Sequence, residues 1–353
     1  MFSDNLRHAV AAMSGYTPGE QLNSPDIIKL NTNENPYPAS PKVVEAIEAA
    51  AKAGLQRYPS AMAQPFREAA SDMFGIDPES VLCGNGSDDI LTILTRAFVG
   101  EGELLRFPRP SYILYGTLAE IQGARSEQIP FESDWSLPDS FGSTSDGLKL
   151  VYLPNPNSPS GTVVSREAIL ELADRLPCPL VVDEAYADFA DFNCLDLSFE
   201  NEKILVTRTL SKSYGLAGLR FGFLVAQPDV VRELIKVKDS YNCDSLSIAA
   251  ATAAVRDQDW LQENRTRVLE TRNVLTSGMK RLGFDVVDSQ ANFTWNTHGS
   301  VPLKPIYEHL KSLDILVRYM DYPGWGEGLR ISVGTDEQIE KCLDRIADCV
   351  QNG

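Results

Sequence analysis

Short apolar runs alternate with helix-like patterns along much of the chain, which is typical of parallel β-α-β units. Residues 80–83 form a largely apolar run that ends at a small, polar segment at 84–87. Apolar positions within 88–98 then recur with the spacing of a helix. This order predicts a strand, a strand-to-helix turn and a helix in succession.

The same pattern returns at 148–153, 180–182 and 203–207, where apolar runs end in polar loops. Continuous apolar strands are typical of a parallel sheet that helices cover on both faces. The sequence therefore predicts an α/β fold with a mostly parallel central sheet. In such a sheet, catalytic groups belong at the carboxyl ends of the strands.

The pattern differs at both ends of the chain, and its 353 residues favour more than one domain. We expect an N-terminal arm at 1–30, a large domain at 31–245 and a smaller α+β domain at 246–353, which the arm joins. Residues 260–282 have helical periodicity with many charges. Residues 134–147, rich in Ser, Asp and Gly, are interpreted as a surface loop.

The amino-acid composition disfavours some classes of binding partner. The chain has 49 acidic and 32 basic residues and a net charge of −17, which disfavours binding to nucleic acid or anionic lipid. No apolar stretch approaches a membrane span and the first residues lack the order of a signal peptide, so we expect a cytoplasmic protein. The six cysteines include no CxxC pair and the three histidines no metal-binding spacing, so we expect reduced thiols and no metal site.

Two ionisable residues follow predicted strands. Lys212 lies among hydroxyl and glycine residues in the segment 209–222; on its own it would be interpreted as a surface charge. Asp183 ends an almost wholly apolar run, where a buried carboxylate needs a cationic partner such as a protonated pyridine nitrogen. An aspartate that caps the following helix is the alternative.

A third strand end is rich in small residues. The turn Gly84-Asn85-Gly86-Ser87-Asp88 would present backbone N–H groups and a helix N-terminus to a phosphate, although a plain helix cap fits the same residues. A phosphate site, an aspartate and a lysine at separate strand ends together indicate pyridoxal 5′-phosphate, whose phosphate, ring nitrogen and aldehyde need these three groups.

Several motifs in a fixed order make the chain resemble the fold-type I aminotransferases, and within them the histidinol-phosphate aminotransferases. The resemblance covers roughly residues 10–345 and is carried by Asn31-Thr32-Asn33-Glu34-Asn35-Pro36, Arg57-Tyr58-Pro59, the turn at 84–88, Pro110-Ser111-Tyr112, Asn155-Pro156-Asn157-Ser158-Pro159-Ser160-Gly161, Asp183-Glu184-Ala185-Tyr186, Ser211-Lys212 and Leu329-Arg330-Ile331-Ser332-Val333-Gly334.

The resemblance implies a role for each matching residue. Lys212 matches the lysine that forms a Schiff base with the cofactor and then acts as general base, and Asp183 matches the partner of the pyridinium. Tyr186 and Asn157 match groups that hydrogen-bond the phenolic oxygen, and Tyr112 a ring that stacks on the cofactor. The phosphate would be bound by Gly86, Ser87, Asp88, Ser211 and Arg220 and by Tyr58 of a neighbouring subunit, and the substrate by Arg330, Arg318, Tyr16 and Asn33.

The chain departs from the family at one motif, because relatives commonly have Asn and Thr where Ser158 and Ser160 stand. Asn157 or Ser158 could therefore meet the phenolic oxygen, and we favour Asn157 because its amide reaches further. The resemblance implies a homodimer with shared active sites that transfers the amino group of L-histidinol phosphate to 2-oxoglutarate. The products would be imidazole-acetol phosphate and L-glutamate, in histidine biosynthesis.

Four alternatives remain. Threonine-phosphate decarboxylase and aromatic amino-acid aminotransferases share the fold and similar motifs; the first would release carbon dioxide rather than form glutamate. A nucleotide-binding α/β protein could use the turn at 84–88, but that turn lacks the GxGxxG fingerprint. A regulator of this fold is disfavoured by the acidic balance and the lack of a DNA-binding appendage.

Overall fold

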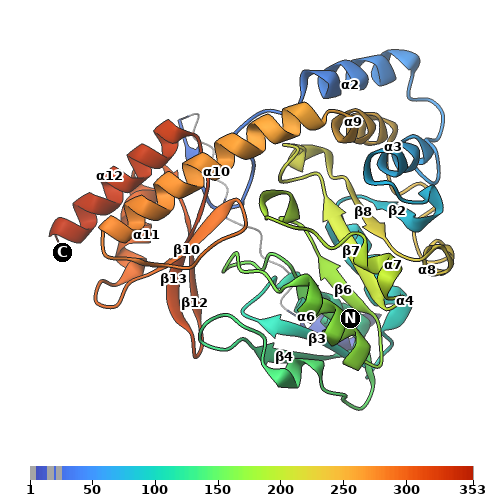
Figure 1. The fold of residues 1–353 in the computed structure, drawn as a ribbon, viewed down its shortest axis with the longest axis horizontal. Helices are drawn as coiled ribbons and strands as arrows, with labels where there is room; N and C mark the ends of the chain where they lie inside the picture. Colours follow the sequence, from blue (N-terminus) through green and yellow to red (C-terminus); the bar gives the residue numbers. More distant parts are fainter. Residues whose placement is uncertain (1–4, 14–19, 21–25, 353) are drawn as a thin grey trace.

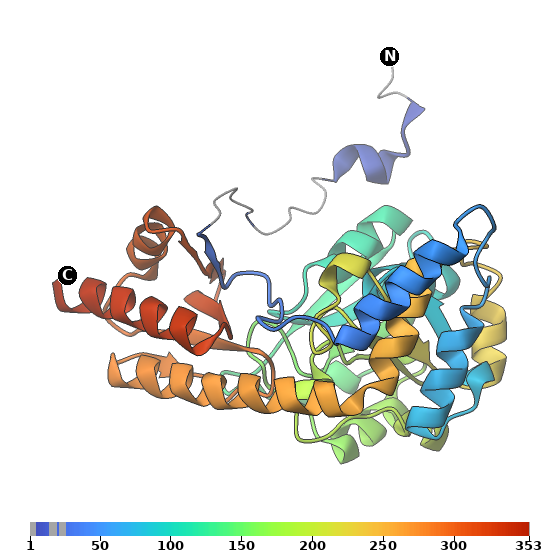
Figure 2. The ribbon, with the colours of Figure 1, turned by 90° about the horizontal axis from the view of Figure 1, so that it is seen from above.

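The computed structural model describes residues 5–13, 20 and 26–352. Within them, a seven-stranded sheet covered by helices forms the larger part of the molecule, and a four-stranded sheet with its own helices forms the smaller part (Figure 1). Helix α10 (Gln258–Arg281) runs from one part to the other, as the view from above shows (Figure 2).

The large sheet confirms the α/β fold expected from the apolar runs. Its strands follow the order β2 (Val81–Gly84), β8 (Gly222–Val225), β7 (Ile204–Thr209), β6 (Leu180–Asp183), β5 (Leu148–Pro154), β3 (Leu104–Arg109) and β4 (Arg125–Pro130). Neighbouring strands are parallel from β7 to β4, whereas β8 is antiparallel to both of its neighbours. The carboxyl ends of β5, β6 and β7 therefore meet at one edge of the sheet.

Helices cover both faces of this sheet, so the strands inside it are largely buried, whereas the edge strand β4 is largely exposed. Successive strand residues point to opposite faces, and Val181 accordingly lies in one apolar cluster while Leu180 and Val182 lie in the other. One face is covered by α2 (Pro41–Ala53), α3 (Gln64–Phe74), α6 (Arg166–Arg175), α7 (Leu197–Glu200) and α9 (Ser245–Arg256), and the other by α4 (Ser87–Phe98), α5 (Leu114–Gln122) and α8 (Pro228–Leu234).

The smaller part is an antiparallel sheet packed against helices. Its strands follow the order β12 (Arg318–Tyr322), β13 (Gly326–Ser332), β10 (Phe293–Thr297) and β9 (Asp285–Val286). Side chains of α10, α11 (Leu303–Ser312) and α12 (Asp336–Asn352) form one core with this sheet. The loop predicted at 134–147 contains a short 3₁₀ turn, Asp139–Gly142, in which Phe141 is buried.

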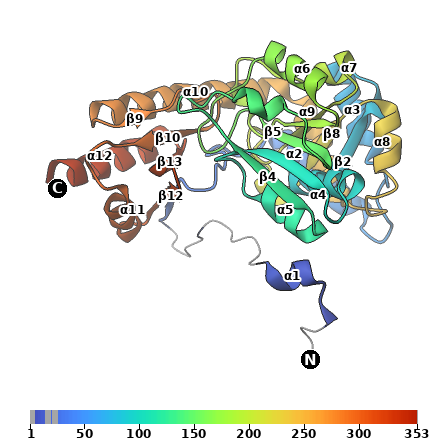
Figure 3. The same cartoon turned by 90° about the horizontal axis from the view of Figure 1, so that it is seen from below.

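The N-terminal residues reach both parts of the molecule. Strand β1 (Ile28–Lys29) pairs in parallel with β11 (Ile315–Leu316), and Leu30 lies in the core of the smaller part. Helix α1 (His8–Ala12), by contrast, lies next to α5 of the larger part (Figure 3). The end of the arm thus contacts the smaller part, whereas its first helix contacts the larger part.

The boundary between the core of the large sheet and the core of the smaller sheet lies later in the chain than residue 246. Ala250, Ala251 and Ala254 of α9 belong to the core of the large sheet, whereas Leu275 and Met279 of α10 belong to the core of the smaller sheet. Packing therefore favours a division within α10, because α9 buries its apolar face against α2 and α3.

In the part of the chain that the structure describes, no helix has the length and apolarity needed to cross a membrane. The cytoplasmic location stays a prediction.

Candidate active site

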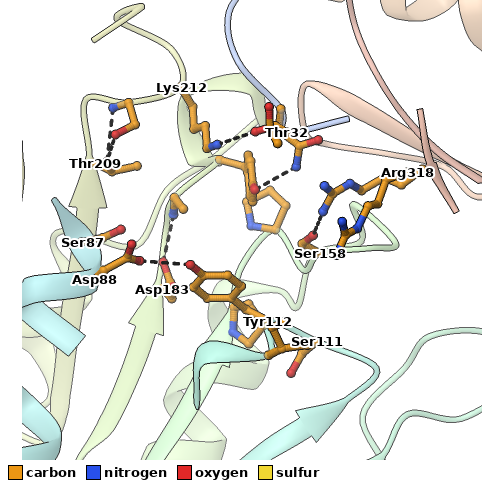
Figure 4. Close-up of a pocket in the computed structure, with 18 of the residues that line it drawn as sticks. Thr32, Ser87, Asp88, Ser111, Tyr112, Ser158, Asp183, Thr209, Lys212 and Arg318 are labelled. Carbon is orange, nitrogen blue, oxygen red and sulfur yellow. Dashed lines mark hydrogen bonds between the residues drawn. The ribbon is translucent and has the colours of Figure 1, made fainter. Parts of the chain in front are cut away.

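A cavity of about 220 Å³ lies where the carboxyl ends of β6 and β7 face strands β12 and β13 (Figure 4). Side chains from both parts of the molecule and from residues 31–33 line it. Of the residues predicted for the site, it brings together Asn33, Ser87, Asp88, Tyr112, Asp183, Tyr186, Ser211, Lys212, Arg220, Arg318 and Arg330. Strand ends that are far apart in the sequence thus form one wall, as the parallel sheet requires.

Asp183 is a buried carboxylate at this cavity. It ends β6, whose four residues are all buried. Its Oδ2 accepts a hydrogen bond from the hydroxyl of Tyr115 at 2.7 Å, and its Oδ1 accepts from the N–H of Ala185 at 3.2 Å and from the hydroxyl of Thr207 at 3.4 Å. Burial raises the pKa of Asp183, which these hydrogen bonds partly offset. Among the described residues no Lys or Arg forms an ion pair with it, so the cavity suits a cationic ligand group.

Lys212 projects into the same cavity from the loop that follows β7 (Figure 4). Its Nζ donates a hydrogen bond to the carbonyl of Thr32 at 2.9 Å and lies 5.9 Å from the centre of the Tyr186 ring. The hydroxyl of Tyr186 accepts a hydrogen bond from Nδ2 of Asn33 at 2.9 Å. Because a neutral carbonyl rather than a carboxylate holds its amine, Lys212 is a candidate nucleophile and general base.

The start of helix α4 forms an anion-binding end of the cavity. Gly86, which precedes the helix, has φ of 84°, a conformation that favours glycine. A Cβ atom at this position would lie 2.7 Å from Nη2 of Arg220. Arg220 donates hydrogen bonds to the hydroxyl of Ser211 at 3.2 Å and to the carboxylate of Asp88 at 3.3 Å. A helix N-terminus, a hydroxyl and a guanidinium together suit a phosphate group.

Two arginines face the cavity from the smaller sheet. Arg318 of β12 and Arg330 of β13 are directly opposite each other in the antiparallel register. Nη1 of Arg330 donates to the hydroxyl of Ser158 and its Nη2 to the carbonyl of Asn31, both at 2.9 Å. Like charges directly opposite on neighbouring strands are unfavourable. An oxygen anion bound between the two strands would offset this repulsion.

The chain is similar to known proteins over almost its whole length. A family model described as aminotransferase class I and II matches residues 25–346. The chain belongs to this family. Histidinol-phosphate aminotransferase from Rhodopirellula baltica is 59% identical over 347 residues, which cover 98% of this chain and 96% of that protein. The protein of the same name from Geotalea uraniireducens is 46% identical over 344 residues, 97% of this chain and 99% of that protein.

Solved structures of aminotransferases share the fold. Histidinol-phosphate aminotransferase from Sinorhizobium meliloti, in complex with pyridoxal 5′-phosphate, has a TM-score of 0.83 at 24% identity, covering 92% of this chain and 91% of that chain. Aromatic aminotransferase from Pyrococcus horikoshii has a TM-score of 0.80 at 21% identity, covering 93% and 96%. The fold-type I aminotransferase architecture expected from the motifs is therefore confirmed.

In this aminotransferase, Asn157 and Ser158 have different surroundings. Nδ2 of Asn157 donates to the hydroxyl of Ser160 at 2.8 Å and to the carbonyl of Pro110 at 3.2 Å, and Asn157 does not line the cavity. Ser158 does line it. The Oδ1 of Asn157 is buried and has no hydrogen-bond partner among the described residues, so the choice between Asn157 and Ser158 stays a prediction.

Tyr58 lies away from the cavity of its own chain. It is 81% exposed and stacks on Tyr241 with ring centroids 4.5 Å apart. This geometry excludes the alternative that Tyr58 packs in its own core, and it leaves the expected contact with a neighbouring subunit as a prediction. Tyr16 lies outside the described residues, and its predicted contact with the substrate stays a prediction as well.

A buried ion-pair network supports the loop of Lys212, and sequence reasoning did not predict it. Nη1 of Arg208 donates to Oε2 of Glu184 at 2.9 Å, and its Nη2 donates to Asp188. The hydroxyl of Ser213 donates to the other oxygen of Asp188. The network thereby ties the residue after Lys212 to the end of β6. In the sequence, the one sign of this network is Arg208, a charged residue within the buried strand β7.

Proposed function

We propose that this chain transfers the amino group of L-histidinol phosphate to 2-oxoglutarate, with pyridoxal 5′-phosphate bound in the cavity. The observation that supports the cofactor most directly is Asp183, a buried carboxylate without a cationic partner among the described residues, in the same cavity as Lys212. The histidinol-phosphate aminotransferase relative at 59% identity supports the choice of substrates.

The described residues fit the cofactor at three points. Asp183 would pair with the protonated ring nitrogen, which supplies the cation that this buried carboxylate lacks. The start of α4, Ser211 and Arg220 would bind the phosphate. Lys212 would hold the aldehyde carbon, and Tyr186, oriented by Asn33, would hydrogen-bond the phenolic oxygen. We propose Tyr112, whose ring lines the cavity, as the stacking partner of the cofactor.

The cofactor, when bound, supplies an aldehyde that takes up the amino group and a ring that withdraws electrons from the reacting carbon. Lys212 is the group placed to remove and return the proton on that carbon. Asp183 keeps a proton on the ring nitrogen, because its buried negative charge favours the cationic form. Arg318 and Arg330, which line the same cavity as Lys212, would bind and orient the anionic end of the substrate.

The paired arginines explain how one site accepts two different substrates. L-Histidinol phosphate carries a phosphate monoester and 2-oxoglutarate carries carboxylates, and a guanidinium binds oxygen anions of both kinds with paired hydrogen bonds. Because the two substrates react in turn, one pair of arginines serves both. Ser158 and the carbonyl of Asn31 hold Arg330 in place for this purpose.

Arg330→Lys is therefore expected to raise the KM of both L-histidinol phosphate and 2-oxoglutarate by about tenfold or more, since hydrogen bonds to charged groups contribute about 1.5–3 kcal/mol. Lysine keeps the charge but loses the planar fork. Steady-state kinetics with each substrate varied measures the effect, and the absorbance of bound cofactor should stay unchanged. Arg345→Lys, at an exposed ion pair in α12, is the matched control. An increase for one substrate only would contradict a shared site and make Arg318 the next residue to replace.

We further propose that the active protein is a homodimer in which Tyr58 of each subunit completes the phosphate site of the other. The support is an aromatic side chain that is 81% exposed and stacked on Tyr241, which is itself 47% exposed. Two large exposed rings are costly in water and are typical of a surface that a partner covers.

Mixing Tyr58→Phe subunits with Lys212→Ala subunits tests the shared site. In a mixed dimer, one site would contain the normal Lys212 of one subunit and the normal Tyr58 of the other, so activity should rise above that of either variant alone. The measurement is transaminase activity at limiting cofactor after dissociation and reassociation. Each variant treated alone is the control. Mixtures that never exceed the sum of the two parents would show that the sites are not shared.

The proposed reaction is tested by its products. Purified protein incubated with pyridoxal 5′-phosphate, L-histidinol phosphate and 2-oxoglutarate should form one L-glutamate for each imidazole-acetol phosphate. Release of carbon dioxide from threonine phosphate without glutamate formation would identify a decarboxylase instead. Faster glutamate formation from aromatic amino acids would identify an aromatic aminotransferase.

A further inference from the structure

A tyrosine that no motif singled out makes the shortest hydrogen bond to Asp183. The hydroxyl of Tyr115 donates to Oδ2 of Asp183 at 2.7 Å. Ala185 and Thr207 donate to the other carboxylate oxygen at 3.2 Å and 3.4 Å. Among the described residues, Tyr115 is therefore the one side chain that holds Oδ2, and it holds it more closely than either donor holds Oδ1.

The ring of Tyr115 is fixed by its neighbours. It is fully buried, stacks on Tyr152 with centroids 4.8 Å apart, and meets Tyr112 edge to face at 5.7 Å. Phe107 packs against it at 5.8 Å. Because these three rings restrict the rotation of Tyr115, the position of its hydroxyl is set before any ligand arrives.

Burial disfavours the ionised form of Asp183, and the hydrogen bonds that its carboxylate accepts counter this effect. Desolvation raises the pKa of Asp183 and the nearby charge of Asp88 on α4 acts in the same direction, whereas the hydrogen bond from Tyr115 lowers it. A neutral carboxyl would not pair with a cationic ring nitrogen. Burial and the adjacent Asp183 raise the pKa of Tyr115 well above its usual value, so its hydroxyl keeps its proton and remains a donor.

We propose that Tyr115 is a positioning residue that keeps Asp183 ionised and aimed at the ring nitrogen of the cofactor. This inference rests on the proposed function, because it assigns to Tyr115 the support of the ion pair on which that function depends. Tyr115 also lines the cavity, and its hydroxyl is bonded to the carboxylate of Asp183, so we expect it to act through Asp183.

The other titratable groups around Asp183 remain the same when Tyr115 is replaced. They are Asp88 on α4, Tyr152 on β5, and Tyr112, Tyr186 and Lys212, which line the same cavity. Removal of the Tyr115 hydroxyl thus changes one donor to the carboxylate and leaves the surrounding charges as they are. Any shift in the pH dependence of cofactor binding can then be assigned to that donor.

Tyr115→Phe is expected to weaken binding of pyridoxal 5′-phosphate by about tenfold or more at the acidic end of the pH range in which the protein stays folded, on the scale of a hydrogen bond to a charged group. The pKa of Asp183 rises when the donor is lost, so the ionised fraction falls as the solution becomes more acidic. The deficit should therefore shrink as the pH is raised. Equilibrium dialysis of the apoprotein against the cofactor over a range of pH measures it without any turnover.

Tyr152→Phe is the matched control. Tyr152 is equally buried and stacks on Tyr115, but its hydroxyl bonds to Thr95 at 2.7 Å and to the carbonyl of Leu91 at 2.9 Å. Its loss should lower stability as the loss of any buried hydroxyl does, and leave the pH dependence of cofactor binding unchanged. A deficit of equal size in both variants, or one that does not vary with pH, would overturn the proposal.

A double-mutant cycle then tests whether Tyr115 acts through Asp183. In an Asp183→Asn background, Tyr115→Phe should cause no further loss of cofactor affinity, because the carboxylate it supports is gone. Additive losses would overturn the proposal. If the unaltered protein binds no pyridoxal 5′-phosphate, the proposed function itself fails; if it binds the cofactor and Tyr115→Phe binds it equally well at every pH, only the role of Tyr115 fails.

Discussion

Replacement of Lys212 by alanine is expected to abolish transamination, with a loss of about 10⁴-fold or more. General acid–base catalysis alone contributes about 10²–10⁴-fold, and the variant also loses the amine that would bond to the aldehyde carbon of the cofactor. Among the described residues that line the cavity, Lys212 is the one lysine. Its Nζ is held by the carbonyl of Thr32 in the cavity that also contains Asp183.

Borohydride reduction of the protein with bound cofactor, followed by peptide mapping, locates the attachment directly. The label should be found on Lys212. Lys212→Arg is the informative companion variant, because it keeps a positive charge near Thr32 and Tyr186 but presents a guanidinium that stays protonated. It should be as inactive as Lys212→Ala. A label on another lysine, or an active arginine variant, would remove Lys212 from its central place.

The sequence predicts the part of the fold that depends on local pattern. The apolar runs at 148–153 and 180–182 become β5 and β6 almost residue for residue, because strands buried on both faces need continuous apolar side chains. The antiparallel direction of β8 was not predicted, since strand direction depends on where the chain returns to the sheet. The sequence pattern does not distinguish α9 from α10, although the two helices bury their apolar side chains in different cores.

The candidate site was predicted where residues follow strand ends and missed where they depend on tertiary contacts. Lys212, Asp183 and the turn before α4 follow apolar runs, so their convergence could be expected from a parallel sheet. The register that places Arg318 opposite Arg330 is a property of paired strands and has no local signal. The role of Tyr115 is missed for the same reason, although it lies only three residues after Tyr112.

Replacement of Asp183 by asparagine should separate function from stability. Asparagine has nearly the same volume and can accept hydrogen bonds from Ala185 and Thr207, but it cannot hold a proton on the ring nitrogen as a buried carboxylate does. We expect transamination to slow by about 10³-fold or more, the scale seen when one preorganised charge-stabilising group is removed. Single-turnover kinetics at saturating cofactor measures this loss without the contribution of weaker binding.

Asp183→Asn should lower activity but should not lower the stability of the apoprotein. Burial raises the pKa of Asp183 in the folded state, so the stability linked to its proton is present at low pH and lost as the pH rises through that pKa. Asparagine removes this cost, and the free energy of unfolding at neutral pH should stay the same or increase. Asp257→Asn is the control. Hydrogen bonds from Lys42 and Ser40 lower the pKa of this carboxylate, which does not line the cavity, so its loss should reduce stability at neutral pH and spare activity. If Asp183→Asn turned over substrate at a near-normal rate, or destabilised the apoprotein as Asp257→Asn does, Asp183 would be a structural residue rather than the partner of the cofactor.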